Sequence, residues 1–167
     1  LTQVLMGCKM DPPAIIGGKL PFIGGNSVVG KSDIIVCEAC EYVNTFLQMH
    51  PAISVILNVD ADHLDFFKNL DNIKKSFNQF AKQTSQLLVI NGDDKNSVEC
   101  TADVNLKKLF YGFDSKNDYY AANYQKGEGV SQSFDLMSDG KLITKITLNV
   151  PGKHNVLNAF AAISFAL

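Results

Sequence analysis

Two acidic segments carry side chains that could hold a metal ion. Residues 38–41 read Glu-Ala-Cys-Glu and follow a short apolar run, and residues 60–65 read Asp-Ala-Asp-His-Leu-Asp and follow a second one. The two runs are expected to be parallel strands, and open α/β sheets bind their ligands at the carboxyl ends of such strands. A carboxylate and an imidazole placed there could hold Mg²⁺ beside nucleotide phosphates. The residues leave open a second interpretation, in which the aspartates are solvated caps on a following helix.

A third candidate lies near the end of the sequence, where a glycine-containing turn leads into an apolar helical segment. Residues 151–159 read Pro-Gly-Lys-His-Asn-Val-Leu-Asn-Ala. The first N–H groups of a helix are free, and residues three or four apart share a face, so His154, Asn155 and Asn158 are expected to lie near one another. An amide both donates and accepts hydrogen bonds, which suits the edge of adenine. The same pattern also fits a buried helix that is merely capped by an asparagine.

The elements that must position these residues alternate between strands and a helix. Short apolar runs at residues 33–37, 54–59 and 87–90 predict buried parallel strands. Between the last two runs, apolar residues at helical spacing predict a helix that Asn69 or Asp71 could cap. These apolar residues are Leu70, Ile73, Phe77 and Phe80. Strand, helix and strand in this order are typical of a parallel sheet.

The later part of the sequence has a different pattern. Residues 133–143 predict a hairpin with a turn at Asp139-Gly140, and residues 145–150 alternate like a half-exposed strand. The sequence therefore predicts an α/β fold, in which a mostly parallel sheet flanked by helices has an antiparallel hairpin extension.

Two further motifs match known chemistry but stand in the wrong context. Residues 25–32 match the phosphate-loop pattern G-x-x-x-x-G-K-[ST], yet such a loop must enter a helix, and here a strand is expected next. Cys37 and Cys40 form a C-x-x-C pair, which could be redox-active or half of a zinc site. No second close-spaced pair exists, and Cys37 closes an expected strand. We therefore expect a plain turn around Lys31 and neither redox chemistry nor zinc binding at the cysteines.

Composition limits the classes of partner. The 167 residues are 46% hydrophobic and 19% charged, with a net charge of −2 and a pI of about 5.9. These values suit one globular domain and give little support to nucleic-acid or anionic-membrane binding. No apolar run approaches the roughly 20 residues that a membrane span needs. The four cysteines form no dense framework, which favours a reducing, cytoplasmic setting.

In their order and spacing, the motifs resemble those of the Mur ligases, the ATP-dependent amide-forming enzymes of peptidoglycan synthesis. The family's Glu-Ala-(Asp or Cys)-Glu cluster is present at residues 38–41, and its Thr-Asn-Ile-Glu-x-Asp-His-Leu-Asp-like run is present at residues 57–65. The series is completed by Thr45-Phe46-Leu47, His50-Pro51, Asn91-Gly92-Asp93-Asp94, Tyr111-Gly112-Phe113 and the block from Pro151 to Asn158. The match runs from about Ile15 to the end. It is closest to the branch that joins L-alanine to UDP-N-acetylmuramate.

This resemblance implies a central domain with a P-loop-NTPase-like sheet over residues 1–167, and it implies roles for five residues. Glu38 matches the family glutamate that binds Mg²⁺ near the γ-phosphate of ATP, and His63 matches the histidine that binds a second Mg²⁺. His154, Asn155 and Asn158 match the block that contacts adenine and ribose. Some relatives carry a carbamylated lysine at the position that Asn78 occupies here, so that lysine does not carry over.

The resemblance also implies a reaction and its substrates. Family members phosphorylate a substrate carboxylate with ATP, and an amino group then attacks the acyl phosphate. The implied substrates are UDP-N-acetylmuramate and L-alanine. Two alternatives stay open: the murein-recycling ligase, which attaches a tripeptide to the same nucleotide sugar, and a non-catalytic nucleotide-binding module. The family's own phosphate loop and its N- and C-terminal domains do not occur in these residues, so we expect a piece of a longer ligase that is inactive by itself.

Overall fold

The computed structural model describes residues 1–166 of the chain. Its helices and strands follow in this order: α1 (Thr2–Gly7), β1 (Ala14–Leu20), the 3₁₀ helix η1 (Pro21–Ile23), β2 (Gly25–Val28), β3 (Val36–Cys37), the 3₁₀ helix η2 (Tyr42–Gln48), β4 (Ile53–Ile56), α2 (Leu64–Phe67), α3 (Leu70–Gln83), β5 (Leu87–Asn91), α4 (Lys95–Thr101), β6 (Lys107–Gly112), β7 (Tyr119–Lys126), β8 (Gln132–Ser138), β9 (Lys141–Leu148) and α5 (Lys153–Ala166).

The largest element is a six-stranded sheet in the order β4-β5-β6-β7-β8-β9. The first four strands pair in parallel, with Ile53 opposite Leu87 and Leu87 opposite Lys107. β7, β8 and β9 pair antiparallel. The expected mostly parallel sheet with an antiparallel hairpin extension is therefore confirmed.

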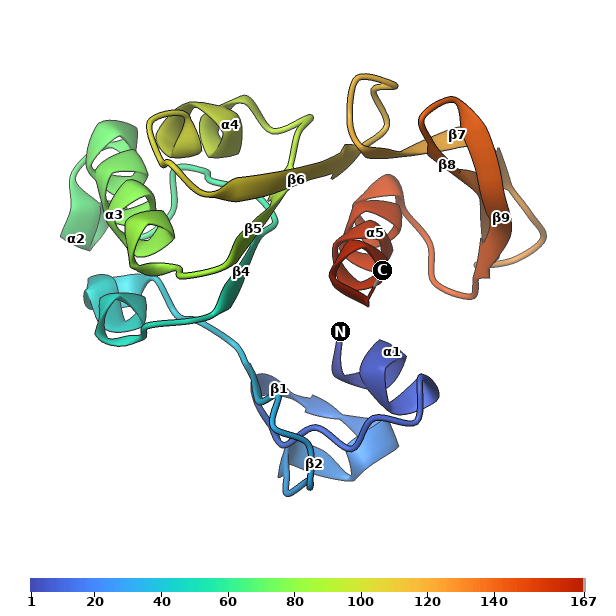
Figure 1. The fold of residues 1–167 in the computed structure, drawn as a ribbon, viewed down its shortest axis with the longest axis horizontal. Coiled ribbons are helices and arrows are strands. Elements are labelled where there is room, and N and C mark those ends of the chain that lie inside the picture. The colour runs from blue at the N-terminus through green and yellow to red at the C-terminus, as the bar shows by residue number, and fades with distance from the viewer. Residues whose placement is uncertain (167) are drawn as a thin grey trace.

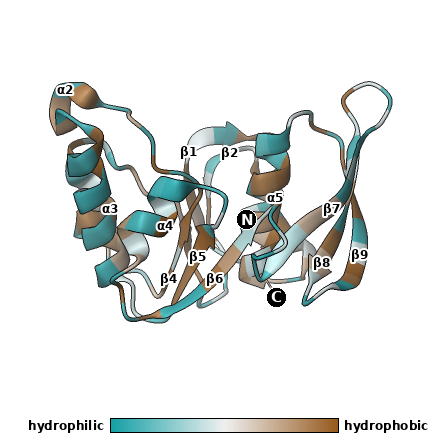
Figure 2. Ribbon diagram, turned by 90° about the horizontal axis from the view of Figure 1, so that it is seen from above, coloured by the Kyte–Doolittle hydropathy of each residue, from teal (hydrophilic) through white to brown (hydrophobic). Residues whose placement is uncertain are grey.

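Helices cover both faces of this sheet because alternate residues of a central strand point to opposite sides. Leu88 and Ile90 of β5 are buried against α3 and α4, whereas Val89 is buried on the other face with Phe160 of α5. Figure 1 shows α3 and α4 on one side of the sheet and α5 on the other, with α1 packed against α5. Figure 2 shows the apolar stretches of β4 and β5 between these layers. Among residues 1–166, no helix combines the length and apolar character that crossing a membrane requires.

α3 begins where the sequence predicts. The side chain of Asn69 accepts a hydrogen bond from the Asn72 N–H at 2.9 Å and so caps the helix, while Ile73 faces the core. Asn78 of α3 donates to the Cys100 carbonyl at 2.8 Å and to Asp103 at 2.6 Å. In this chain Asn78 therefore ties α3 to α4.

The hairpin of β8 and β9 turns at Asp139 and Gly140, as expected. Both residues have positive φ angles, 50° and 73°, which matches the twist that a two-residue hairpin turn requires. The strand expected at residues 145–150 is not separate, because β9 runs without a break from Lys141 to Leu148.

The first part of the chain differs from the sequence prediction. Residues 33–37 were expected to form a buried strand of the main sheet, but only Val36 and Cys37 are extended, and they pair with β1 in a separate sheet of order β2-β1-β3. Ile35 is 60% exposed, so the buried interpretation is wrong. A local turn explains the short strand, because the Ser32 hydroxyl accepts a hydrogen bond from the Ile34 N–H. Similarly, β4 ends at Ile56 rather than at Val59.

Candidate functional site

Three side chains that could ligate a metal ion meet just beyond the carboxyl end of β4. Nε2 of His63 lies 3.4 Å from Oε1 of Glu41, and Nδ1 lies 3.9 Å from Oδ1 of Asp62. One ligand atom from each of the three residues lies within 4.8 Å of the others. The His63 side chain is 36% exposed and that of Glu41 33%, so both can reach an ion from solvent. Two carboxylates beside an imidazole make a donor set that fits a divalent cation.

The His63 ring is held from a second side. Its centroid lies 4.7 Å from the centroid of the Tyr42 ring, and the Tyr42 hydroxyl donates to Asp65 at 3.4 Å. His63 itself has a φ of 51°, in the left-handed region, and precedes α2. The orientation of the imidazole is therefore fixed by its neighbours and by an unusual backbone conformation.

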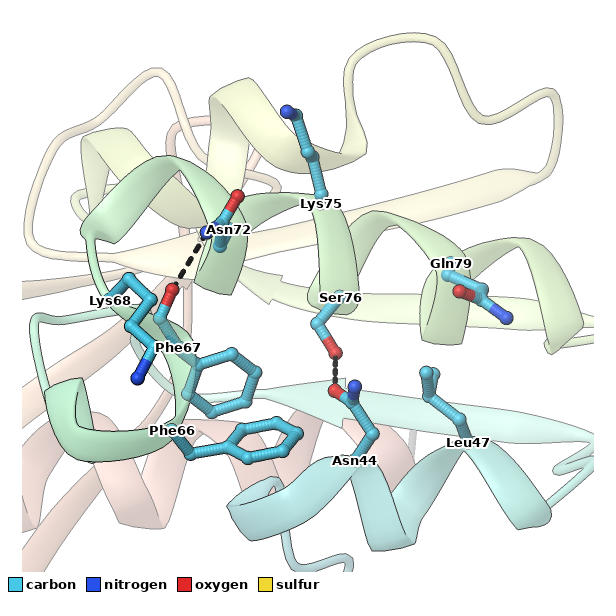
Figure 3. A pocket seen from close by; sticks show the side chains of 9 residues that line it. All are labelled: Asn44, Leu47, Phe66, Phe67, Lys68, Asn72, Lys75, Ser76 and Gln79. Carbon is cyan, nitrogen blue, oxygen red and sulfur yellow. Dashed lines mark hydrogen bonds between the residues drawn. The ribbon is translucent and has the colours of Figure 1, made fainter.

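Both segments of this cluster are anchored on α3. η2, which follows Glu41, is tied through a hydrogen bond from the Ser76 hydroxyl to Oδ1 of Asn44. α2, which follows His63, is tied because Nδ2 of Asn72 donates to the Phe67 carbonyl at 2.8 Å. Figure 3 shows both bonds at a hollow of about 290 Å³ between these elements.

A second cavity, of about 320 Å³, lies directly beside the metal-ligating cluster. Its lining combines acidic and amide side chains with apolar ones: Glu41, Asn58, Asp60, Ala61, Asp62, Phe67, Ile73 and Phe77. Carboxylate and amide oxygens are the ligands that Mg²⁺ and its bound waters prefer. The cavity and the cluster therefore form one candidate site, which we call the acidic site.

Glu38 does not join this cluster. Its Oε2 accepts a hydrogen bond from the Gly17 N–H at 2.7 Å, so the carboxylate lies against β1. A β-carbon at position 17 would come within 3.0 Å of Oε1 of Glu38, so glycine leaves room for this approach. Among the described residues, the structure brings His63 together with Glu41, and it places Glu38 at the small sheet. The assignment of Glu38 and His63 as two metal ligands stays a prediction.

The start of α5 lies on the same edge of the main sheet as the acidic site. Asp94, after β5, accepts a hydrogen bond from the Val59 N–H at 3.1 Å, and Asp93 accepts one from the Phe113 N–H at 2.5 Å. Nζ of Lys153 lies 5.3 Å from the centroid of the Phe113 ring. These contacts connect the carboxyl ends of β4, β5 and β6 to the first turn of α5. They follow the edge at which parallel sheets bind ligands.

The three residues expected to contact a nucleotide lie in the first two turns of α5. His154 and Asn158 are exposed, and Asn155 is half-buried. Nδ2 of Asn155 donates to the Pro151 carbonyl at 2.7 Å, which leaves its oxygen free to accept. Gly152 has a φ of 95°, and a β-carbon there would lie 2.6 Å from the His154 ring. Glycine is therefore needed at this turn for both its conformation and its small size.

The segment that matches a phosphate loop does not lead into a helix. After β2, residues 29–35 form a loop that leads to β3. The Lys31 N–H donates to the Asp11 carboxylate at 3.1 Å, and the Ser32 N–H donates to the Asp11 carbonyl at 2.9 Å. A carboxylate thus occupies the place where a phosphate would have to bind. The segment leads into β3 and not into a helix, as expected, and the absence of a phosphate-binding role for Lys31 stays a prediction.

A model of the Mur ligase middle domain matches residues 21–166. The chain belongs to this family. The UDP-N-acetylmuramate–L-alanine ligase of Clostridium botulinum (strain Langeland) is 42% identical over 169 residues, which cover 100% of this chain and 37% of the relative. The chain thus spans little more than a third of the curated relatives that it matches.

Two solved Mur ligases share the fold. UDP-N-acetylmuramate-alanine ligase from Thermotoga maritima superposes with a TM-score of 0.82 at 26% identity, over 98% of this chain and 36% of that one. UDP-N-acetylmuramate:L-alanyl-γ-D-glutamyl-meso-diaminopimelate ligase from Neisseria superposes with a TM-score of 0.85 at 24% identity, over 99% and 55%. At that identity the second likeness shows the fold alone.

Sequence reasoning missed two groups of residues in this Mur ligase domain. The sequence motif gives Glu41 no separate role, although Glu41 is the carboxylate that reaches His63. The signal for it was weak, because nothing in the spacing of two glutamates three residues apart says which of them turns toward His63. The motif likewise gives no role to Asp93 and Asp94, although they join the ends of three strands.

Proposed function

We propose that this chain supplies the ATP- and Mg²⁺-binding middle domain of a cytoplasmic ligase that joins L-alanine to UDP-N-acetylmuramate. The observation that carries the proposal is the acidic site, on the same sheet edge as the start of α5. Relatives that are 42% identical over the whole chain bear the name of the alanine ligase, which favours it over the recycling ligase. The four free cysteines are in keeping with a reducing compartment.

Each part of the site has a separate task in this proposal. Glu41, Asp62 and His63 would hold Mg²⁺, because their ligand atoms converge and remain open to solvent. When bound, the ion would neutralise charge on the phosphates and so favour attack by a carboxylate. His154, Asn155 and Asn158 would contact the adenine and ribose of ATP.

The orientation of His63 supports this assignment. A metal-ligating histidine usually donates its second ring N–H to a carboxylate, which fixes the ring and makes it a better ligand. With Glu41 near Nε2 and Asp62 near Nδ1, either nitrogen has a carboxylate beside it. One nitrogen can therefore hold the ring while the other faces an ion.

The test uses the complete ligase that contains these residues. Purified enzyme is given ATP, Mg²⁺ and UDP-N-acetylmuramate together with either L-alanine or the tripeptide, and the amide product is measured. We expect product with L-alanine, and we expect Glu41→Gln to reduce it strongly. Glu128→Gln is the matched control, because Glu128 is exposed in the loop between β7 and β8. Preference for the tripeptide would refute the substrate assignment, and full activity of Glu41→Gln would refute the metal assignment.

A further inference from the structure

We infer that Asp94 and Asn96 are positioning residues for the acidic site, because together they hold the backbone of Val59 and thereby the loop that carries His63. We call this pair the Val59 bridge. The inference builds on the proposed function, since it assigns the way in which the loop with Asp62 and His63 is kept in place for an ion. Neither residue touches the cluster itself, so both act through the loop.

Val59 needs such partners because it is buried after its strand has ended. β4 stops at Ile56, yet Val59 is only 1% exposed and packs in the core beneath α3. Its N–H donates to Oδ1 of Asp94 at 3.1 Å, and its carbonyl accepts from Nδ2 of Asn96 at 2.8 Å. A buried peptide group without partners is costly, so the two side chains replace the strand ladder that β5 no longer provides.

A third contact extends the same arrangement toward β4. Nδ2 of Asn91 donates to the Leu57 carbonyl at 3.0 Å, and its Oδ1 accepts from the Asp93 N–H at 3.1 Å. Three side chains, from the end of β5 to the first turn of α4, thus fix the backbone at positions 57 and 59.

Beyond Val59, the loop is held mostly by bonds within itself until it reaches the cluster. The Ala61 N–H donates to the Asp60 carboxylate at 2.7 Å, and the His63 N–H donates to Oδ1 of Asp62 at 2.7 Å. These short-range bonds shape the turn, but they do not fix its place on the sheet. The Val59 bridge is the nearest preceding attachment to another element, so a loosened Val59 would let Asp62 and His63 shift away from Glu41.

A simpler role for Asp94 must be separated from this one. Oδ1 of Asp94 also accepts from the Ser97 N–H at 2.8 Å and from the Ser97 hydroxyl at 2.5 Å, so Asp94 caps α4. Asn96 distinguishes the positioning role from helix capping, because its side chain bonds the Val59 carbonyl and does not cap α4. Asn96→Ala removes one bond to the loop while favouring the helix slightly. Asp94→Ser retains a capping oxygen on a shorter side chain, and Asp94→Asn retains an acceptor of the same reach.

The test follows Mn²⁺, as a stand-in for Mg²⁺, into the site by NMR. The chain has three histidines, so the ring signals of His63 can be assigned and compared with those of exposed His50. We expect Mn²⁺ to broaden the His63 signals first. Asn96→Ala and Asp94→Ser should each raise the apparent dissociation constant about fivefold or more, the factor expected for one hydrogen bond, and Asp94→Asn should stay within about twofold of wild type.

The control is Asn78→Ala, which removes the bonds between α3 and α4 at the far end of α4. It should lower stability without raising the dissociation constant for Mn²⁺. The inference is overturned if Asn96→Ala and Asp94→Ser both bind Mn²⁺ as wild type does, or if Asn78→Ala weakens binding as much. If Asp94→Ser does not fold, Asn96→Ala decides.

A separate outcome concerns the proposed function. If wild-type chain binds no Mn²⁺, the metal assignment fails, and the positioning role is then decided by amide hydrogen exchange alone. Faster exchange at positions 59–63 in Asn96→Ala, but not in Asn78→Ala, would support the Val59 bridge. Unchanged exchange there would overturn it.

Discussion

Nε2 of His63 lies 3.4 Å from Oε1 of Glu41, although Glu41 directly precedes η2 and His63 directly precedes α2. The contact depends on α3, because Ser76 and Asn72 of that helix hold the two segments at adjacent positions. A substitution of either residue should therefore weaken binding of the ion without unfolding the sheet. The core clusters that stabilise the sheet contain neither Glu41 nor His63.

The first prediction concerns His63. In the complete ligase, His63→Ala should lower kcat by roughly 10²-fold or more, because an electrostatic stabiliser at the reacting phosphates is lost. Initial rates at saturating substrates measure the effect. His50→Ala is the matched control, since His50 is exposed and precedes β4 at the opposite edge of the sheet. Wild-type turnover of His63→Ala would refute a role for this imidazole.

A second prediction distinguishes Glu38 from Glu41. Glu38→Ala should also lower kcat by roughly 10²-fold or more if Glu38 holds an ion near the γ-phosphate. Its hydrogen bond to the Gly17 N–H allows a purely local role, in which Glu38 only fixes β1 against β3. The dependence of the rate on Mg²⁺ concentration separates the two. A metal ligand shifts this dependence to higher Mg²⁺, whereas a local role lowers the rate at every concentration alike.

Much of the fold follows from the sequence, and the exceptions share a cause. α3, its Asn69 cap and the Asp139-Gly140 turn depend on local spacing and on residues with few conformational choices, and all three are confirmed. The strand expected at residues 33–37 is limited to Val36–Cys37 by the turn at Ser32, and it pairs with β1 instead of joining the main sheet. Which distant segment pairs with a short apolar run is not contained in the run itself.

The candidate site shows the same division. The sequence predicts His63 just after a strand and a helix just after the turn at Pro151-Gly152, and both lie on the carboxyl edge of the sheet. It does not predict that Glu41 rather than Glu38 faces His63, nor the left-handed backbone of Val43 and Asn44 just after Glu41. Both residues have positive φ angles, 48° and 58°, which no spacing rule anticipates.

The third prediction concerns Lys31. In the complete ligase, Lys31→Ala should leave the affinity for ATP nearly unchanged, because the exposed Lys31 side chain belongs to a loop whose N–H groups are bonded to Asp11. Equilibrium binding of a fluorescent ATP analogue measures this affinity. Lys141→Ala, in the exposed hairpin, gives the baseline for loss of one surface charge. A large loss specific to Lys31→Ala would restore the phosphate-loop interpretation.

The last prediction concerns Cys100, whose thiol is buried in α4 while Cys8, Cys37 and Cys40 are exposed. Burial, with the nearby charge of Asp94, raises the pKa of the Cys100 thiol to about 11. At pH 8, a thiol reagent should therefore label three cysteines quickly and Cys100 only after unfolding, as counted by mass spectrometry.

The raised pKa of Cys100 also affects stability. Because the unfolded thiol ionises at lower pH than the folded one, the free energy of unfolding should fall as pH rises from about 9 to about 11. Cys100→Ala should show a smaller fall in urea titrations over this range, with the remainder expected from Tyr111, whose pKa is also raised by burial. Equal fast labelling of all four cysteines in the folded chain would contradict the placement of α4 against α3.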